Sequence, residues 1–252
     1  MLRYLAFLYG VVGYAAFLGV FLYAIAFLCG LPVPVNVDTP SKLGAGEAAI
    51  VDLVLLGLFG VQHSGMARRA FKRAWTKVVP EHVERSTFVW ASDAALALVL
   101  WQWQGIPAVV WQVESPVVRG AVWGLAALGW LLLLASTFAV SHADLFGLRQ
   151  VYFHLRERAA APFKLFTGSL YGVVRHPIML GFVIAFWAAP TMTAGHLLFS
   201  AVATGYILAA IQLEERDLIA AFGEAYRRYR RDVPMLIPFL SRRAAGRSAT
   251  DS

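Results

Sequence analysis

The fold of this chain is decided by residues 171–238, which read YGVVRHPIMLGFVIAFWAAPTMTAGHLLFSAVATGYILAAIQLEERDLIAAFGEAYRRYRRDVPMLIP. Two apolar runs in this stretch are joined by a short segment from Pro190 to Gly195. Polar and charged residues gather before the first run and after the second, in a chain that is otherwise apolar. The pattern predicts a helical hairpin flanked by two polar motifs.

The first polar motif, from Tyr171 to Gly181, is predicted to open a helix. Pro177 suits the first helical position, because the N–H group that proline lacks is not needed there. The free N–H groups beside it form a positive pole that favours an anion, and Arg175 adds a permanent positive charge. Gly181 lies one turn further on, where the missing side chain lets another group approach the backbone.

The second polar motif is predicted to be an amphipathic helix. Residues at helical spacing share one narrow stripe of it, namely Glu215, Leu218, Phe222, Tyr226 and Tyr229. A carboxylate held among aromatic rings suits a ligand that carries hydroxyl groups and positive charge.

The composition is that of an integral membrane protein. Of the 252 residues, 59% are hydrophobic and 15% are charged, and the mean hydropathy is +0.63. A chain of this kind is too apolar for a soluble domain. Because about 20 residues cross a bilayer, full spans are predicted near residues 5–29, 48–66, 87–103 and 118–140.

The hairpin is predicted to differ from these full spans. Its arms, near residues 177–190 and 196–213, are too brief for two upright crossings, so we expect a tilted or re-entrant hairpin packed against protein. The predicted fold class is therefore all-α: an integral membrane helical bundle with four full spans, a C-terminal helical hairpin and a cytoplasmic amphipathic helix.

The position of the basic residues decides the orientation and argues against a nucleic-acid partner. The net charge is +7, and basic residues crowd the segment of residues 67–86. Lys42 is the only basic residue in the loops around residues 30–47 and 104–117. By the positive-inside rule the basic segment is cytoplasmic, which places both termini there.

Two histidines near the cytoplasmic boundary are candidates for a catalytic base. His142 and Asp144 follow the fourth predicted span, where Asp144 and Gln150 could orient the imidazole ring. His63 lies at the inner end of the second span, at the same membrane face. A simple structural interpretation stands beside each, since such groups also cap membrane helices or lie at the interface.

Other common site signatures are absent from the sequence. There is no P-loop, no Gly-x-Gly-x-x-Gly and no His-Glu-x-x-His motif, and Cys29 is the single cysteine. The six histidines are not spaced as helical ligand pairs. No metal site is therefore expected.

The polar motifs resemble those of a known enzyme family. Arg-His-Pro-x-x-x-Gly at 175–181, Glu-Glu at 214–215 and Phe-Gly-x-x-Tyr-x-x-Tyr at 222–229 are similar to the core of the membrane methyltransferases related to isoprenylcysteine carboxyl methyltransferase. The resemblance implies that S-adenosylmethionine binds here. The implied cofactor residues are Tyr171, Arg175, His176, Pro177, Gly181, Glu214, Glu215, Leu218, Tyr226 and Tyr229.

The resemblance also implies which groups of the cofactor each of these residues contacts. Arg175 and the helix start at His176 and Pro177 would receive its carboxylate or ribose side. Glu215, with the two tyrosines of the second motif, would take its amino or hydroxyl groups. The structural alternative is that Arg175 pairs with Glu214 and that the tyrosines only pack the hairpin.

Further stretches narrow the resemblance to the bacterial methanethiol S-methyltransferases. These stretches are residues 62–68, 79–87, 101–103, 142–152, 185–188 and 190–196. The NnrU-like membrane proteins of denitrifying bacteria share part of the pattern. The resemblance implies methylation of methanethiol to dimethyl sulfide in the bacterial inner membrane, with a small volatile thiol as substrate and a cytoplasmic active site. The alternatives are an isoprenylcysteine-type carboxyl methyltransferase and a non-catalytic NnrU-like membrane protein.

The chain is divided accordingly. The predicted parts are an N-terminal transmembrane hairpin (1–66), a basic cytoplasmic loop (67–86), a second transmembrane hairpin (87–140), an S-adenosylmethionine-binding catalytic core (141–240) and a disordered tail (241–252).

Overall fold

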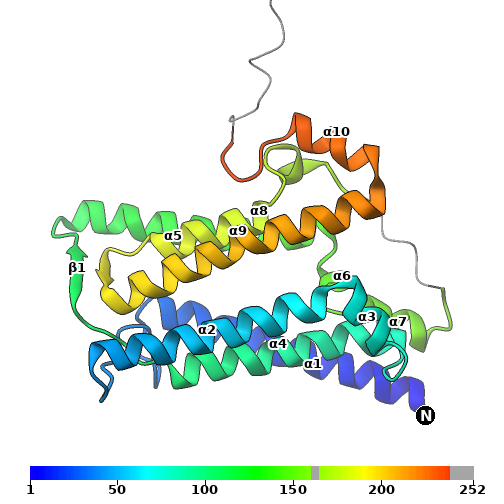
Figure 1. The fold of residues 1–252 in the computed structure, drawn as a ribbon, viewed down its shortest axis with the longest axis horizontal. Helices are drawn as coiled ribbons and strands as arrows, with labels where there is room; N and C mark the ends of the chain where they lie inside the picture. Colours follow the sequence, from blue (N-terminus) through cyan, green and yellow to red (C-terminus); the bar gives the residue numbers. More distant parts are fainter. Residues whose placement is uncertain (160–164, 239–252) are drawn as a thin grey trace, which may run out of the picture.

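The computed structural model describes residues 1–159 and 165–238, which form a bundle of helices (Figure 1). In chain order the elements are α1 (Leu2–Leu28), α2 (Ala45–Ala67), α3 (Arg69–Trp75), α4 (Glu81–Gln102), β1 (Val109–Gln112), α5 (Pro116–Val140), α6 (His142–Leu145), α7 (Leu148–Leu155), the 3-10 helix η1 (Ser169–Gly172), α8 (Pro177–Trp187), β2 (Thr191–Thr193), α9 (Ala194–Phe222) and α10 (Glu224–Asp232). The predicted all-α bundle is confirmed. The predicted disordered tail, residues 241–252, lies outside the described residues.

Four helices of the described part are long and apolar enough to cross a membrane: α1, α2, α5 and α9. Large apolar side chains on their surfaces are exposed, including Leu22, Val61 and Leu131. Apolar surface of this extent is unusual for a protein in water and suits contact with lipid tails. The predicted spans at 5–29, 48–66 and 118–140 lie within the first three of these helices, apart from Cys29, which caps α1.

The third predicted span, residues 87–103, belongs to a longer and more polar helix. α4 begins at Glu81, directly after Pro80, and carries Glu84 and Arg85 in its first turns. Asp93, in the middle of this helix, is buried. Because α4 packs against both α1 and α2, neighbouring helices rather than lipid surround its polar positions.

The structure corrects the prediction that both arms of the hairpin are short. α8 has 11 residues, which gives a length of about 17 Å and is too short to cross a bilayer. α9 has 29 residues and runs on through Glu214 and Glu215. The fall in hydropathy at Glu214 therefore does not end the helix, since helical hydrogen bonding continues past the end of the apolar run.

α5 and α8 approach each other closely enough for their backbones to come into contact. A Cβ atom built on Gly181 would lie 2.7 Å from the carbonyl oxygen of Gly129 and 2.7 Å from the amide nitrogen of Leu133. A Cβ atom on Gly129 would lie 2.8 Å from the amide nitrogen of Ala185. Gly181 thus lets α5 approach the backbone of α8, and the group predicted to come close at this position is the backbone of a neighbouring helix.

A small sheet closes one end of the bundle. β1 pairs antiparallel with β2, so that the α4–α5 connection is tied to the turn between α8 and α9. At the same end, Gln104 donates its backbone N–H to the buried carboxylate of Asp52 at 2.9 Å. The sheet was not predicted, because strands of three and four residues have no clear periodicity.

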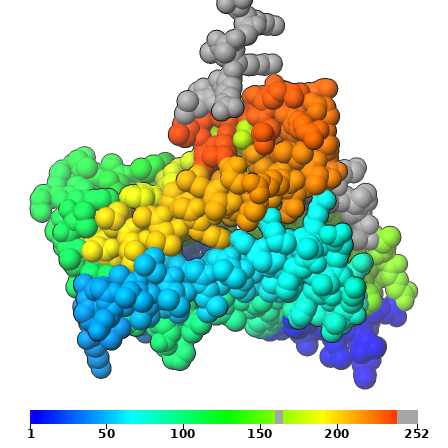
Figure 2. All heavy atoms as spheres, viewed as in Figure 1, coloured from blue at the N-terminus to red at the C-terminus, as the bar shows by residue number. Residues whose placement is uncertain are grey.

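The other end of the bundle holds the N-terminus, α3, α6 and α7, and α9 ends towards α10 on the same side (Figure 1). The predicted basic loop, residues 67–86, consists of α3 and the start of α4. In the space-filling view α2 and α9 diverge near their middles and leave a hollow between them (Figure 2). Towards α3 they meet again, where Ser64 and Tyr206 share a hydrogen bond of 2.9 Å and Arg68 pairs with Asp217 at 2.9 Å.

Candidate active site

Glu215 is the centre of a buried ion cluster between α8, α9 and α10. Its carboxylate oxygen Oε1 lies 2.8 Å from Nε of Arg175 and 3.2 Å from Nε2 of His176. Its second oxygen, Oε2, lies 3.6 Å from the guanidinium of Arg230. The predicted grouping of Arg175, His176 and Glu215 is therefore present, and the pairing of Arg175 with Glu214 that was considered as an alternative is wrong.

The segment after α10 is hydrogen-bonded to the residues that precede α8. Arg175 donates its backbone N–H to the carbonyl oxygen of Pro234 at 2.9 Å, and His176 donates to Met235 at 3.2 Å. The Arg175 guanidinium also donates to the carbonyl oxygens of Arg230 and Val233. These bonds use Nε and Nη1 of Arg175, so the side chain holds the α8 start, α9 and α10 together.

The helix start itself forms as predicted. Pro177 is the first residue of α8 and is buried, with His176 as the N-cap. Within the described residues, the amides of Ile178 and Met179 in the first turn have no hydrogen-bond acceptor. Two donors at the positive end of a helix remain available to an anionic or hydroxyl-bearing ligand.

Glu214, next to the buried Glu215, is the open carboxylate of the pair. Its side chain is 48% exposed, and Oε2 lies 3.7 Å from Nδ1 of His176. Electrostatic interactions also couple Glu214 to Tyr171 and to Arg85 of α4. An open carboxylate that faces an aromatic ring and a cation suits an ammonium or hydroxyl group of a ligand better than the fully engaged Glu215 does.

The predicted continuous aromatic stripe is broken at Gly223. This residue has φ 57°, in the left-handed region that favours glycine, and it separates α9 from α10. Leu218 stays on α9, whereas Tyr226 and Tyr229 belong to α10. The stripe was predicted on one straight helix, and instead the chain turns so that the two tyrosines fold back towards Glu215.

Three tyrosines from two elements, η1 and α10, meet beside the carboxylates. Tyr229 donates its hydroxyl to the carbonyl oxygen of Tyr171 at 2.6 Å, and its ring lies 5.7 Å from that of Tyr226. The hydroxyl of Tyr226 is buried and has no partner in the described part of the chain. Burial raises the pKa of Tyr229 to about 12 and raises the pKa of Tyr171 and Tyr226 above the ordinary value, so all three are protonated donors at neutral pH.

A second polar centre surrounds His142, just after α5. Thr137 donates its single hydroxyl hydrogen to the carbonyl oxygen of Leu134 at 2.7 Å. It can therefore only accept from Nδ1 of His142, which lies 2.9 Å from its Oγ1. The Nδ1–H tautomer leaves Nε2 with a lone pair, and the hydroxyl of Tyr14 donates to it at 2.8 Å.

Aromatic rings hold the His142 imidazole in place. Phe138 is stacked on it with a ring-centre distance of 4.3 Å, and Phe146 lies at 4.7 Å. The ring of Tyr14 meets it edge-on at 5.6 Å. Burial lowers the pKa of His142, so the ring stays neutral at neutral pH and can accept a proton.

Asp144 does not orient His142, and this part of the prediction is wrong. Its carboxylate pairs with Arg149 at 2.6 Å, and its backbone carbonyl accepts from the side-chain amide of Gln150 at 3.2 Å. Asp144 therefore stabilises the short α6–α7 segment. The closeness of His142 and Asp144 in sequence was a poor guide to their contact, because side chains two residues apart on a helix point in different directions.

His63 lies apart from this centre, between α2 and α4. Its Nδ1 lies 3.1 Å from the hydroxyl of Ser92, and its ring packs against Phe59 and Phe88 at 5.3 and 5.0 Å. Arg85 contacts the same Phe88 ring, with its guanidinium 4.7 Å from the ring centre. Its Nε donates to the carbonyl oxygen of Leu145 of α6 at 2.6 Å. These contacts place His63 in a packed helix interface.

Tyr171 joins the two polar centres. Its hydroxyl donates to the carbonyl oxygen of Ser136 at 3.4 Å, one residue before Thr137, while its own carbonyl accepts from Tyr229. The structure thus links Tyr171, the Glu215 ion cluster and the tyrosines of α10 to the end of α5 that precedes His142, whereas Gly181 packs against α5, and Asp144 and His63 have other partners. Tyr14, Arg85 and Arg230 were not predicted. No sequence signal separates Tyr14 from the other tyrosines of α1.

In the described residues, no group of three His, Cys, Asp or Glu side chains could hold a metal ion.

The chain is similar to proteins of one family over most of its length. Residues 53–229 match the family described as NnrU protein. The chain is 54% identical over 239 residues to a methanethiol S-methyltransferase of Mycobacterium tuberculosis, covering 95% of this chain and 98% of that protein. It is 50% identical over 237 residues to methanethiol S-methyltransferase 1 of Bradyrhizobium diazoefficiens, covering 94% and 83%.

A more distant similarity extends to Nurim of Rattus norvegicus, which is 33% identical over 178 residues and covers 66% of each chain. No solved structure matches this chain. The chain therefore belongs to the NnrU protein family and to the family of its methanethiol S-methyltransferase relatives.

Proposed function

We propose that this protein is an S-adenosylmethionine-dependent methyltransferase that converts methanethiol to dimethyl sulfide at the membrane. The observation that carries the proposal is the identity of 54% over nearly the whole chain to a protein named methanethiol S-methyltransferase. The geometry supports it, because one set of residues suits a charged cofactor and an adjacent neutral histidine suits a proton acceptor.

The residues of the first centre fit the cofactor. S-Adenosylmethionine carries an ammonium group, a carboxylate and ribose hydroxyls, so a site for it needs donors and acceptors close together. Glu214 offers an open carboxylate and the first turn of α8 offers free amides. The buried hydroxyl of Tyr226 is a polar atom that needs a partner, since an unpaired buried hydroxyl costs free energy. Arg175, His176, Glu215 and Arg230 hold these elements together.

The proton path starts at Tyr14. When bound, S-adenosylmethionine supplies a methyl carbon on a positively charged sulfur, which a thiolate attacks in line. Tyr14 accepts the proton of the thiol as its own hydroxyl proton passes to Nε2 of His142. His142 then holds the positive charge, and Thr137 keeps its Nδ1–H oriented. A positioned base of this kind contributes about a hundredfold or more to the rate.

The apolar surroundings fit this charge balance. Attack of a thiolate on a cationic donor removes two opposite charges, so a dry pocket favours the reaction. Phe17, Phe138 and Phe146 line the Tyr14–His142 pair. The hollow between α2 and α9 in Figure 2 is a route by which a small apolar thiol could arrive from the bilayer.

The cellular arrangement is part of the proposal. The protein lies in the bacterial inner membrane, with both termini and both polar centres on the cytoplasmic side. S-adenosylmethionine then reaches the polar centres from the cytoplasm. The basic α3 and the C-terminal α10 support this orientation, because basic residues gather at this end of the bundle.

The test uses the purified full chain in lipid nanodiscs with S-adenosylmethionine and a panel of thiols, followed by gas chromatography of the headspace. We expect methanethiol to be converted to dimethyl sulfide, with one S-adenosylhomocysteine formed for each dimethyl sulfide. Methylation of a prenylated cysteine carboxylate in its place would identify the isoprenylcysteine-type alternative. Absence of S-adenosylhomocysteine binding by calorimetry would identify a non-catalytic membrane protein.

A further inference from the structure

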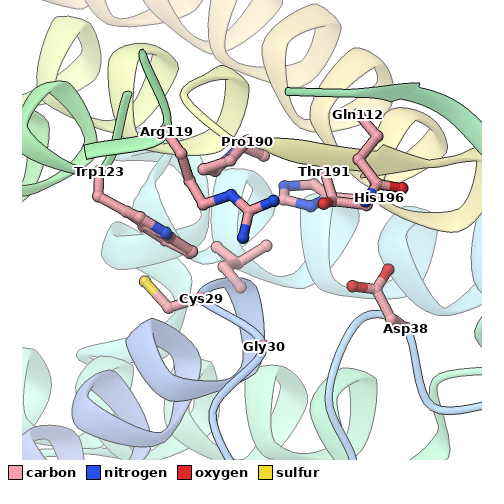
Figure 3. A pocket seen from close by; sticks show the side chains of 11 residues that line it. Cys29, Gly30, Asp38, Gln112, Arg119, Trp123, Pro190, Thr191 and His196 are labelled. Atoms are coloured by element: carbon pink, nitrogen blue, oxygen red, sulfur yellow. The ribbon is translucent and has the colours of Figure 1, made fainter. Parts of the chain in front are cut away.

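A cavity of about 280 Å³ lies at the end of the bundle opposite to both polar centres. It is built where helices begin or end, with Cys29 following α1, Arg119 and Trp123 in the first turns of α5, and His196 in the first turn of α9 (Figure 3). The full length of α5 separates Arg119 from His142. The cavity is therefore distinct from the candidate active site.

The helix ends fix the depth of this cavity in the membrane. α1, α5 and α9 are each long and apolar enough to cross a bilayer. Their ends consequently lie at the level of the lipid headgroups rather than in the hydrocarbon core. Trp123 is 40% exposed beside the cavity, and tryptophan is enriched at this level of membrane proteins.

A cation and an anion face the cavity without pairing with each other. Arg119 reaches into it from α5 and Asp38 lies on the opposite side (Figure 3). Arg119 uses Nη2 to donate to the carbonyl oxygen of Val113 at 3.2 Å, which leaves other guanidinium donors open. One oxygen of Asp38 accepts from the hydroxyl of Thr193 at 2.6 Å, which leaves the second oxygen open.

His196 adds a second acceptor to the cavity wall. Its Nε2 lies 3.0 Å from the carbonyl oxygen of Phe186 and must donate to it, because a carbonyl oxygen only accepts. In the neutral ring, Nδ1 is then an acceptor. The cavity thus offers guanidinium donors on one side and the carboxylate of Asp38, with the imidazole, as acceptors for a cation.

We propose that this cavity binds the headgroup of a bilayer phospholipid that carries both a phosphate and a primary ammonium, as phosphatidylethanolamine does. Arg119 binds the phosphate, for which the guanidinium geometry is suited. Asp38 accepts from the ammonium, which carries three donors. The cavity of about 280 Å³ has room for a phosphoethanolamine group.

The experiment is native mass spectrometry of the delipidated full chain in detergent, titrated separately with phosphatidylethanolamine, phosphatidylcholine and phosphatidylglycerol. We expect the wild-type protein to bind phosphatidylethanolamine most tightly. Arg119→Gln should weaken binding of all three lipids by about tenfold, as expected for loss of a charge-assisted hydrogen bond. Asp38→Asn should remove the preference for phosphatidylethanolamine, because only the ammonium contact depends on its charge.

The variants are chosen to leave the fold intact. Asparagine at position 38 can still accept from Thr193, and glutamine at position 119 replaces a single exposed side chain whose bond to Val113 is 3.2 Å. Lys42→Gln removes a positive charge from the loop between α1 and α2, outside the residues that line the cavity, and serves as the matched control.

Three results would overturn the proposal. The first is an equal loss of binding in Lys42→Gln and Arg119→Gln, which would indicate an unspecific charge effect. The second is an unchanged headgroup preference in Asp38→Asn. The third is saturable binding of water-soluble glycerophosphoethanolamine together with no binding of the intact lipid, which would identify a soluble ligand instead.

Discussion

The hydroxyl of Tyr14 on α1 donates to Nε2 of His142 across 128 residues of sequence, at 2.8 Å. The hydrogen bond has a fixed direction, because Thr137 occupies Nδ1 and donates its own hydrogen elsewhere. A neutral histidine with an aligned tyrosine is ready to take up a proton. The N-terminal helix thereby contributes to a site whose other parts lie in the C-terminal half.

Tyr14→Phe should lower the turnover of methyl transfer by about tenfold or more, because in the proposed mechanism the Tyr14 hydroxyl relays the proton from the thiol to His142. The affinity for S-adenosylhomocysteine should stay unchanged. Tyr9→Phe is the matched control, since Tyr9 lies on the same helix and its hydroxyl contacts Thr87 at 3.2 Å. Equal turnover in Tyr14→Phe and Tyr9→Phe would assign Tyr14 to packing.

The pH profile of turnover separates His142 from water as the proton acceptor. Because burial lowers the pKa of His142, the active neutral form persists below the ordinary titration range of histidine. Wild-type turnover should therefore stay level through neutral pH and fall only in more acidic buffer. His142→Ala should lose activity at neutral pH and recover part of it as the pH rises; a profile identical to that of the wild type would rule His142 out.

Glu214 and Glu215 should respond differently to the same substitution. Glu215→Gln leaves Arg175 and Arg230 without their buried counter-charge, and breaking such a buried pair costs about 3–5 kcal/mol of stability. Glu214→Gln changes an open side chain, so stability should hold while the affinity for S-adenosylhomocysteine falls by about tenfold.

Thermal unfolding in detergent and calorimetry on the same preparations measure these two effects. Glu224→Gln, on the exposed start of α10 where Glu224 pairs with Arg231, is the control for a general charge change. An unchanged affinity in Glu214→Gln would remove Glu214 from the proposed cofactor site.

Gly181→Ala should destabilise the α5–α8 contact. The added methyl group would meet backbone atoms of Gly129 and Leu133 at 2.7 Å, and such overpacking costs about 1–3 kcal/mol. Gly205→Ala on α9 is the control, because its methyl group would meet nothing within 4 Å. The melting temperature should fall only for Gly181→Ala; equal melting temperatures in both variants would contradict the packing role of Gly181.

The proposed orientation can be tested with reporter fusions. A reporter inserted in residues 70–80, in or after α3, should behave as cytoplasmic, as should one fused after α10. Periplasmic activity at the first position would reverse the arrangement and place the polar centres on the outer side.

The sequence predicted features that depend on neighbours along the chain. The run of apolar residues in α1 defines a span by itself, and Pro177 marks the start of α8 by its own geometry. The grouping of Arg175, His176 and Glu215 was also predicted, through the resemblance of their motifs to those of a known family, although as cofactor residues and not as an ion cluster. These predictions needed no knowledge of how distant helices pack.

The features that the sequence missed depend on packing. Asp144 pairs with Arg149, five residues on, and His142 instead contacts Tyr14 of α1, a partner that its neighbours in the sequence do not indicate. Gly181 was predicted to let another group approach the backbone, but the sequence does not identify that group as Gly129 of α5. Gly223 was included in a helical stripe, and only its positive φ shows that the helix ends there.

The most direct test of the central claim is transfer of a labelled methyl group from S-adenosylmethionine to methanethiol by the purified protein, with the headspace analysed by gas chromatography and mass spectrometry. The proposed function predicts labelled dimethyl sulfide at a rate that falls sharply in His142→Ala and Tyr14→Phe and not in Tyr9→Phe. A wild-type protein that binds S-adenosylhomocysteine yet forms no labelled dimethyl sulfide would contradict it.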